Sequence, residues 1–209
     1  MGAVLSALLV YSVIYVEVMP TAGAEGGAVL RRYRAAARTE EGNLRCELVQ
    51  RVGHPNQFAI LEAWRDQPSF EAHGRGAGST DMREKIAAIR NAPTDERVHT
   101  ALSVGPIAFN AAAGAIYVLT HVDVIPPRKD DGVAAVKQLA DAGRAANGNL
   151  RFEVVQQTTR PNHFTVVEVW ASAAAAQAHS MAAATRQFRD ALAPMTGALY
   201  DERMYTAVD

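Results

Sequence analysis

The sequence has a single cysteine, no excess of charge of either sign, and no long hydrophobic run beyond its first residues. One cysteine, Cys46, rules out an intramolecular disulfide and leaves the redox compartment open. A formal net charge of −1 offers a phosphate backbone no general attraction. We therefore expect a globular protein without a nucleic-acid partner.

Several functional motifs are also missing. The six histidines lack the His-x-x-x-His or cysteine spacing of a metal site, and neither a glycine-rich phosphate loop nor a Gly-x-Ser-x-Gly elbow occurs. The stretch from Gly2 to Val18 is apolar, but it has no basic start and Glu17 interrupts it. We expect no metal, no membrane partner and a cytoplasmic location.

The chain does contain an internal repeat. Residues 42–64 and 148–170 are identical at 12 of 23 positions without a gap, and the offset, 148 − 42 = 106, holds along the chain. Repeats of this kind indicate duplication of one structural unit. We expect one repeat at 1–105, a linker at 106–113 and a second repeat at 114–209.

Each repeat has the same order of expected elements. Val10 to Val18 and its counterpart from Ile116 to Val124 are expected to be first strands. Apolar residues three and four apart predict a following helix from about Gly26 to Glu41, ending at Gly42. Two strands, 44–52 and 57–64, join through Pro55 and Asn56, and short helices and a last strand follow. The class is α+β, with two ferredoxin-like β-α-β-β-α-β repeats.

The third strand of each repeat is apolar on both sides. Side chains alternate along a strand, so Phe58, Ile60, Glu62 and Trp64 share one face while the alanines and leucine between them share the other. A sheet that is apolar on both faces must be covered on both. Helices can cover one face, so we expect the two sheets to pack on each other as an intramolecular α/β barrel.

The pattern Glu-x-Trp-x8-His occurs twice, from Glu62 to His73 and from Glu168 to His179, each after Gly-Asn-Leu-Arg-x-Glu and Pro-Asn-x-Phe. It resembles the antibiotic biosynthesis monooxygenase domain, and the first copy, EAWRDQPSFEAH, is closest to the quinol monooxygenase branch. The resemblance implies a tandem version of the dimeric α/β barrel. It also implies a small aromatic or quinol substrate, O2 and no cofactor, and leaves room for a homodimer of the two-repeat chain.

The implied chemistry needs a base, because O2 reacts poorly with a phenol until the phenol is deprotonated. It also needs a dry apolar wall that keeps water away from the anion. Histidine can be the base near neutral pH. The resemblance makes His73 and His179 the candidate catalytic residues. The candidate pocket residues are Phe58, Ile60, Glu62, Trp64, Arg83, Phe164, Val166, Glu168, Trp170, Arg189 and His121.

Structural explanations remain open for the same residues. His73 could only cap its helix or bond Glu62, and the two tryptophans could be ordinary core. A lone Glu62 would be costly to bury, so we expect it to pair with arginine or histidine. Whether the chain is an enzyme at all is open. The alternative function is a non-catalytic binding or stress-response protein that holds a small apolar ligand in the same barrel.

Overall fold

The computed structural model describes residues 9–107 and 114–208. The chain divides into two compact units, one built mainly on residues up to Thr100 and the other mainly on those from Ala101 to Tyr205. Most of the expected linker 106–113 and the start of the apolar N-terminal stretch lie outside the described residues. The exact repeat boundaries at 105 and 114 therefore stay predictions.

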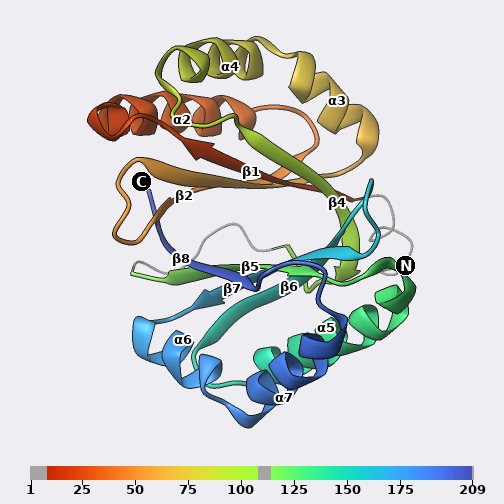
Figure 1. The fold of residues 1–209 in the computed structure, drawn as a ribbon. Coiled ribbons are helices and arrows are strands. Elements are labelled where there is room, and N and C mark those ends of the chain that lie inside the picture. Colours follow the sequence, from red (N-terminus) through yellow and green to blue (C-terminus); the bar gives the residue numbers. More distant parts are fainter. Residues whose placement is uncertain (1–8, 108–113, 209) are drawn as a thin grey trace. The chain divides into compact units, whose positions relative to one another are not determined.

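The first unit is a four-stranded antiparallel sheet in the order β4-β1-β3-β2. Helices α2, α3 and α4 cover one of its faces (Figure 1). Its elements are β1 (Val10–Glu17), η1 (Pro20–Ala22), α2 (Gly23–Ala37), β2 (Asn43–Arg51), β3 (Gln57–Trp64), α3 (Gln67–Arg75), α4 (Ala77–Ile89) and β4 (Asp95–Ser103).

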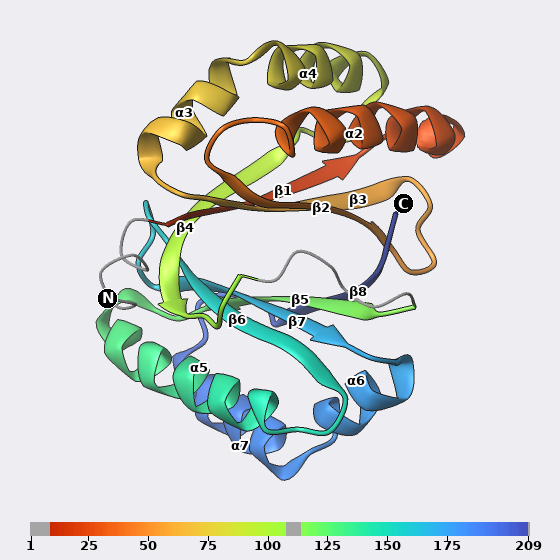
Figure 2. The same ribbon diagram turned by 180° about the vertical axis from the view of Figure 1, so that it is seen from behind.

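The second unit repeats this arrangement, with the strand order β8-β5-β7-β6. Figure 2 shows α5, α6 and α7 against one face of its sheet. Its elements are β5 (Ile116–Asp123), η2 (Pro126–Arg128), α5 (Lys129–Arg144), β6 (Asn149–Gln157), β7 (His163–Trp170), α6 (Ala173–Ser180), α7 (Ala183–Leu192), η3 (Ala193–Met195) and β8 (Asp201–Ala207). The expected α+β class with two ferredoxin-like repeats is confirmed.

Both faces of the central strand β3 are buried, as its composition requires. Phe58, Ile60 and Trp64 belong to the core that the helices cover. Ala59 and Leu61 point to the opposite face and are also no more than 2% exposed. Strand alternation thus separates a helix-covered core, which contains Glu62, from a second buried face.

The end of the first long helix differs from expectation. The helix α2 ends at Ala37, not near Glu41, and turns lead on to Gly42, whose φ of +87° is left-handed. A Cβ at Gly42 would stand 2.3 Å from the Ser69 hydroxyl oxygen. Glycine is therefore needed at this position for its backbone angle and for the close approach of α3, rather than as a helix cap.

The two units fill the same core position in different ways. In the second unit Phe152 occupies the place of Cys46, and it lies so close to α5 that a Cβ on Gly143 would be 2.2 Å from its ring. The first unit has Ala37 at the position of Gly143, where the smaller Cys46 leaves room for a methyl group. The helix residue and the strand residue therefore differ together: alanine faces the small cysteine in one unit, and glycine faces the large phenylalanine in the other.

Gly143→Ala should destabilise the protein, because the new methyl group must displace a buried ring. We expect a loss of about 1–3 kcal/mol in the free energy of unfolding by urea titration. Gly74→Ala is the control, since nothing lies within 4 Å of its Cβ position. Adding Phe152→Leu should recover part of the loss. Equal stability of Gly143→Ala and wild type would contradict the packing described.

Candidate functional site

The short helix α3 positions His73 over the helix-covered core. Asp66 ends the preceding loop and accepts a hydrogen bond from the Ser69 amide at 2.9 Å, and Pro68 lies in the first turn. The helix then turns the His73 ring inward, where it is 3% exposed. The ring stacks on Trp64, with ring centroids 4.4 Å apart and an interplanar angle of 29°.

Glu62 is the carboxyl group at the centre of this cluster, and its side chain is fully buried. It accepts hydrogen bonds from the Tyr33 hydroxyl at 2.8 Å and from the Trp64 indole at 3.2 Å. The Cys46 thiol approaches it at 3.6 Å, and His73 Nε2 lies 3.6 Å from Oε1. The expected pairing with a histidine is present, but the shortest contact is to a tyrosine.

Burial decides the protonation tendencies of these groups. Desolvation raises the pKa of Glu62, although the neighbouring His73 and the hydrogen bonds from Tyr33 and Trp64 oppose the rise. Burial, then the nearby Glu62, raise the pKa values of the Tyr33 hydroxyl and the Cys46 thiol. The hydroxyl and thiol therefore stay protonated and serve as hydrogen-bond donors.

Both ring nitrogens of His73 have partners. Nδ1 lies 2.8 Å from Oε2 of Glu40, whose side chain is 30% exposed. Nε2 lies 2.6 Å from the Tyr33 hydroxyl and 3.2 Å from the Ser79 hydroxyl. The Ser79 hydroxyl also donates to the His73 carbonyl at 2.7 Å, which ties α3 to α4. The histidine is thus held on two sides and oriented.

The second unit keeps only part of this cluster. His179 stacks on Trp170 with centroids 4.7 Å apart, and the Trp170 indole donates to Glu168 at 2.8 Å. His179 Nε2 lies 3.8 Å from Glu168 Oε2 and 3.4 Å from the Thr185 hydroxyl. The ring of Phe152 stands edge-on to His179, at 5.6 Å between centroids. An apolar ring thus replaces the thiol of Cys46.

The charge balance differs accordingly. Burial raises the pKa of Glu168 to about 8, opposed by the hydrogen bond from Trp170. Burial also lowers the pKa of His179. Both groups favour their neutral forms near pH 7, so this pair is a neutral one.

The two candidate arginines lie outside these clusters. Arg83 is exposed and donates to the Gly74 carbonyl at 2.9 Å, so it caps the end of α3. Arg189 donates in the same way to the Ser180 carbonyl at 2.9 Å, and it pairs with Glu202 at 3.1 Å. Their hydrogen bonds and ion pairs therefore involve helix ends and surface groups.

The other candidates are divided by strand alternation. Phe164 and Val166 belong to the helix-covered core with Trp170, as Phe58 and Ile60 do in the first unit. His121 is paired with Thr165 across β5 and β7, and its Nδ1 lies 3.3 Å from that hydroxyl. Thr165 and Glu168 are three residues apart, so His121 lies on the sheet face opposite Glu168.

Sequence reasoning missed the residues that complete the first cluster. In the sequence, Tyr33 is only one of the apolar positions of the long helix. Glu40 lies just beyond the end of α2. Ser79 had a detectable signal, since the second repeat also places a hydroxyl, Thr185, six residues after its histidine. The buried Cys46 contacts a carboxyl group, which nothing in the sequence indicated.

A cavity of about 450 Å³ opens at the far end of the same strand face in the first unit. Phe58 lines it together with Arg31, Gln50 and glycines of α2. Four residues separate Phe58 from Glu62, a distance of roughly 13 Å along a strand. Gly27 borders the cavity, and a Cβ there would meet Phe58 at an ordinary contact distance of 3.6 Å.

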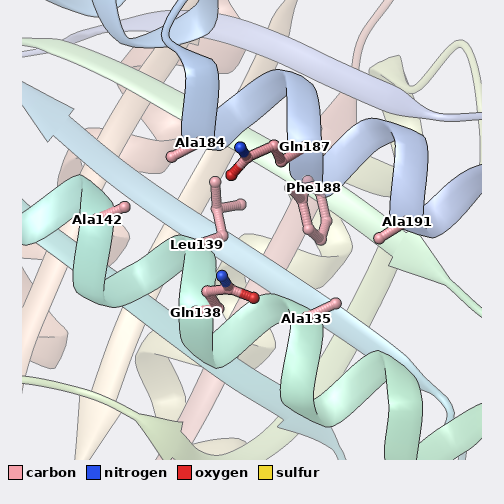
Figure 3. Close-up of a pocket in the computed structure, with 8 residues that line it drawn as sticks. All are labelled: Ala135, Gln138, Leu139, Ala142, Ala184, Gln187, Phe188 and Ala191. Atoms are coloured by element: carbon pink, nitrogen blue, oxygen red, sulfur yellow. The ribbon is translucent and has the colours of Figure 1, made fainter.

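The second unit has a smaller cavity of about 100 Å³ between α5 and α7 (Figure 3). None of its lining residues is a candidate site residue. They are Ala135, Gln138, Leu139, Ala142, Ala184, Gln187, Phe188 and Ala191.

Within the described ranges 9–107 and 114–208, no group of three histidine, cysteine or acidic side chains is arranged to hold a metal ion. Among the same residues no helix is both long enough and apolar enough to cross a membrane.

The doubled ferredoxin-like unit, with a buried carboxyl–tryptophan–histidine group in each copy, defines the class of protein. Its sheet, helices and buried group recur at the same positions in both repeats. A profile of the antibiotic biosynthesis monooxygenase family matches residues 9–85 and 115–191. The chain belongs to this family, with two copies of its domain.

Individual relatives agree with this assignment. YcnE of Bacillus subtilis (strain 168), a candidate monooxygenase, is 32% identical over 89 residues, which are 43% of this chain and 93% of YcnE. A candidate monooxygenase from Fusobacterium nucleatum has a similar structure, with a TM-score of 0.85, 16% identity and coverage of 97% and 94% of the two chains. An anthrone oxidase-like protein gives a TM-score of 0.73 at 12% identity, covering 97% and 92%. The two structures share the fold over both repeats.

The raised pKa of Glu168 predicts that stability falls as pH rises. The folded protein holds a proton to about pH 8 that the unfolded chain releases near its ordinary value, so wild type should lose a few kcal/mol of unfolding free energy between about pH 5 and pH 8. Glu168→Gln should lose less over this range. Urea titrations at both pH values measure the difference.

Asp190→Asn is the matched control, because it removes an exposed carboxyl group of the same unit. Its pH dependence should follow wild type. Identical pH slopes for wild type and Glu168→Gln would show that Glu168 is not protonated in the folded protein at neutral pH.

Proposed function

We propose that this protein is a cofactor-independent monooxygenase that oxidises a small hydroxylated aromatic or quinol with O2. Family membership and the relatives support the reaction class. The observation that carries the proposal is the buried His73, oriented by Glu40 and Tyr33 and stacked on Trp64. A buried histidine held in one orientation suits a general base for a phenol.

The reaction balances without an external reductant. The base removes a proton from the substrate hydroxyl or activated C–H, and the electron-rich anion reacts with O2. In an anthrone one oxygen atom becomes the carbonyl at the CH2 carbon, which loses both hydrogens; in a quinol it becomes a hydroxyl on a ring carbon while the two quinol hydroxyls become carbonyls. The other oxygen atom leaves as water. A quinol thereby gives a hydroxyquinone and an anthrone gives an anthraquinone, with both electron pairs supplied by substrate. The chain's own contribution is the base and the exclusion of water.

Oxygen uptake by metal-stripped protein with a panel of quinols and anthrones tests the proposal. His73→Ala should lower kcat by about 10²-fold or more, the usual contribution of a positioned base. His179→Ala serves as the matched variant from the second repeat. Full turnover in the double variant would remove histidine from the mechanism, and no uptake with any substrate would reject the monooxygenase function.

Binding without turnover is the second candidate, and the cavity beside Phe58 favours it. Its volume of about 450 Å³ lies in the range that holds small ligands, and it combines apolar walls with Arg31 and Gln50. It also lies at the opposite end of the strand face from His73. A small aromatic with an anionic group matches this lining.

Gly27→Leu separates the two candidates, because the leucine side chain should obstruct the cavity beside Phe58. Calorimetric titration with the same aromatic panel should show binding lost in Gly27→Leu and retained in His73→Ala if binding is the function. Gly74→Ala controls for adding a side chain to a helix of this unit. Unchanged affinity in Gly27→Leu would place any ligand elsewhere.

A further inference from the structure

A continuous line of hydrogen bonds connects the buried carboxyl group of the first unit to its surface. The Tyr33 hydroxyl lies 2.8 Å from Glu62 and 2.6 Å from His73 Nε2, and His73 Nδ1 lies 2.8 Å from Glu40. The side chain of Glu62 is 0% exposed and that of Glu40 is 30% exposed. The line therefore begins in the core and ends at water.

The same number of protons fits this line in two arrangements. In one, Glu62 is a carboxylate that accepts from the Tyr33 hydroxyl, which accepts from a doubly protonated His73. In the other, a neutral Glu62 donates to Tyr33, which donates to Nε2 of a neutral His73. Nδ1–H donates to Glu40 in both. Two short proton shifts interconvert them, and no heavy atom has to move.

The second unit does not carry the same line. With the offset of 106, Leu139 stands for Tyr33 and Ala146 for Glu40, and neither side chain can donate or accept a hydrogen bond. His179 lies 3.8 Å from Glu168 with no hydroxyl at the position that Tyr33 holds in the first unit. The second pair is thus separated from the proton path that the first pair has.

We propose that Tyr33 and Glu40 form a proton relay with Glu62 and His73, which makes the first unit the proton-transferring half of the chain and leaves the second a structural half. The catalytic role of this relay rests on the proposed monooxygenase function. In the arrangement with a neutral His73, Nε2 takes the proton from the substrate's O–H or C–H in place of the Tyr33 hydrogen bond, the Nδ1 proton moves to the Glu40 carboxylate, and Glu40 releases it to water. Tyr33 and Glu40 act through His73, so they are positioning residues.

The first test is spectroscopic and needs no substrate. In protein labelled with 15N-histidine, Glu40→Gln should replace the carboxylate that holds the proton on Nδ1 of His73 by a neutral amide that can accept or donate, and so mix the two tautomers of His73. Tyr33→Phe should shift Nε2 and leave Nδ1 unchanged. His179 is the internal reference in the same spectra. Glu41→Gln is the matched control, since that side chain is 89% exposed and pairs with Arg65.

The second test is kinetic. Tyr33→Phe and Glu40→Gln should each lower kcat for oxygen uptake by about tenfold or more with KM nearly unchanged. Glu41→Gln should keep kcat within about twofold of wild type, well inside the loss expected when a proton-transfer group is removed.

The outcomes separate this proposal from the proposed function. Unchanged His73 signals in Glu40→Gln overturn the relay, whatever the activity. Changed signals with kcat retained in both variants show hydrogen bonds without proton transfer and also overturn it. If wild type takes up no oxygen with any substrate, the monooxygenase function fails, while the spectra still decide whether the connected line exists. Loss of kcat in His179→Ala equal to that in His73→Ala overturns the division between the units.

Discussion

A carboxyl group buried in an apolar core is the constraint on which the rest of each unit depends. Glu62 and Glu168 lie on the same strand face as the residues that form the core, where an unpaired charge would be very costly. Each unit must supply donors or keep the group neutral. The neighbouring tryptophan and histidine are the shared answer, and they explain why the Glu-x-Trp-x8-His spacing is present twice.

The two units differ in the groups that surround the buried acid. The first adds a tyrosine hydroxyl, a thiol and an outer carboxylate around the buried acid and its histidine. The second fills the same volume with Phe152, which packs tightly on Gly143, and keeps its acid and histidine neutral. Duplication relaxes the need for two identical sites. The buried clusters of the two copies accordingly differ in their polar groups.

Much of the fold could be predicted from the sequence. The repeat, its period, the β-α-β-β-α-β order and the burial of both faces of β3 follow from local patterns, because strand alternation and helical spacing are properties of short segments. The end of α2 could not be placed well. The helix ends at Ala37, before Gly42, and the need for glycine at position 42 depends on the approach of Ser69, a residue distant in sequence that pattern reasoning does not bring near it.

The candidate site shows the same division. The sequence alone indicated that Glu62, Trp64 and His73 belong to one site, since one strand and the helix after it fix their spacing. Only the tertiary structure decided that Tyr33 and Glu40 complete the cluster and that Arg83 and His121 do not contact it. These residues come from other elements, and their meeting depends on how helices pack on the sheet. Side-chain direction and packing distance, which no local pattern encodes, decided which polar groups meet the buried acid.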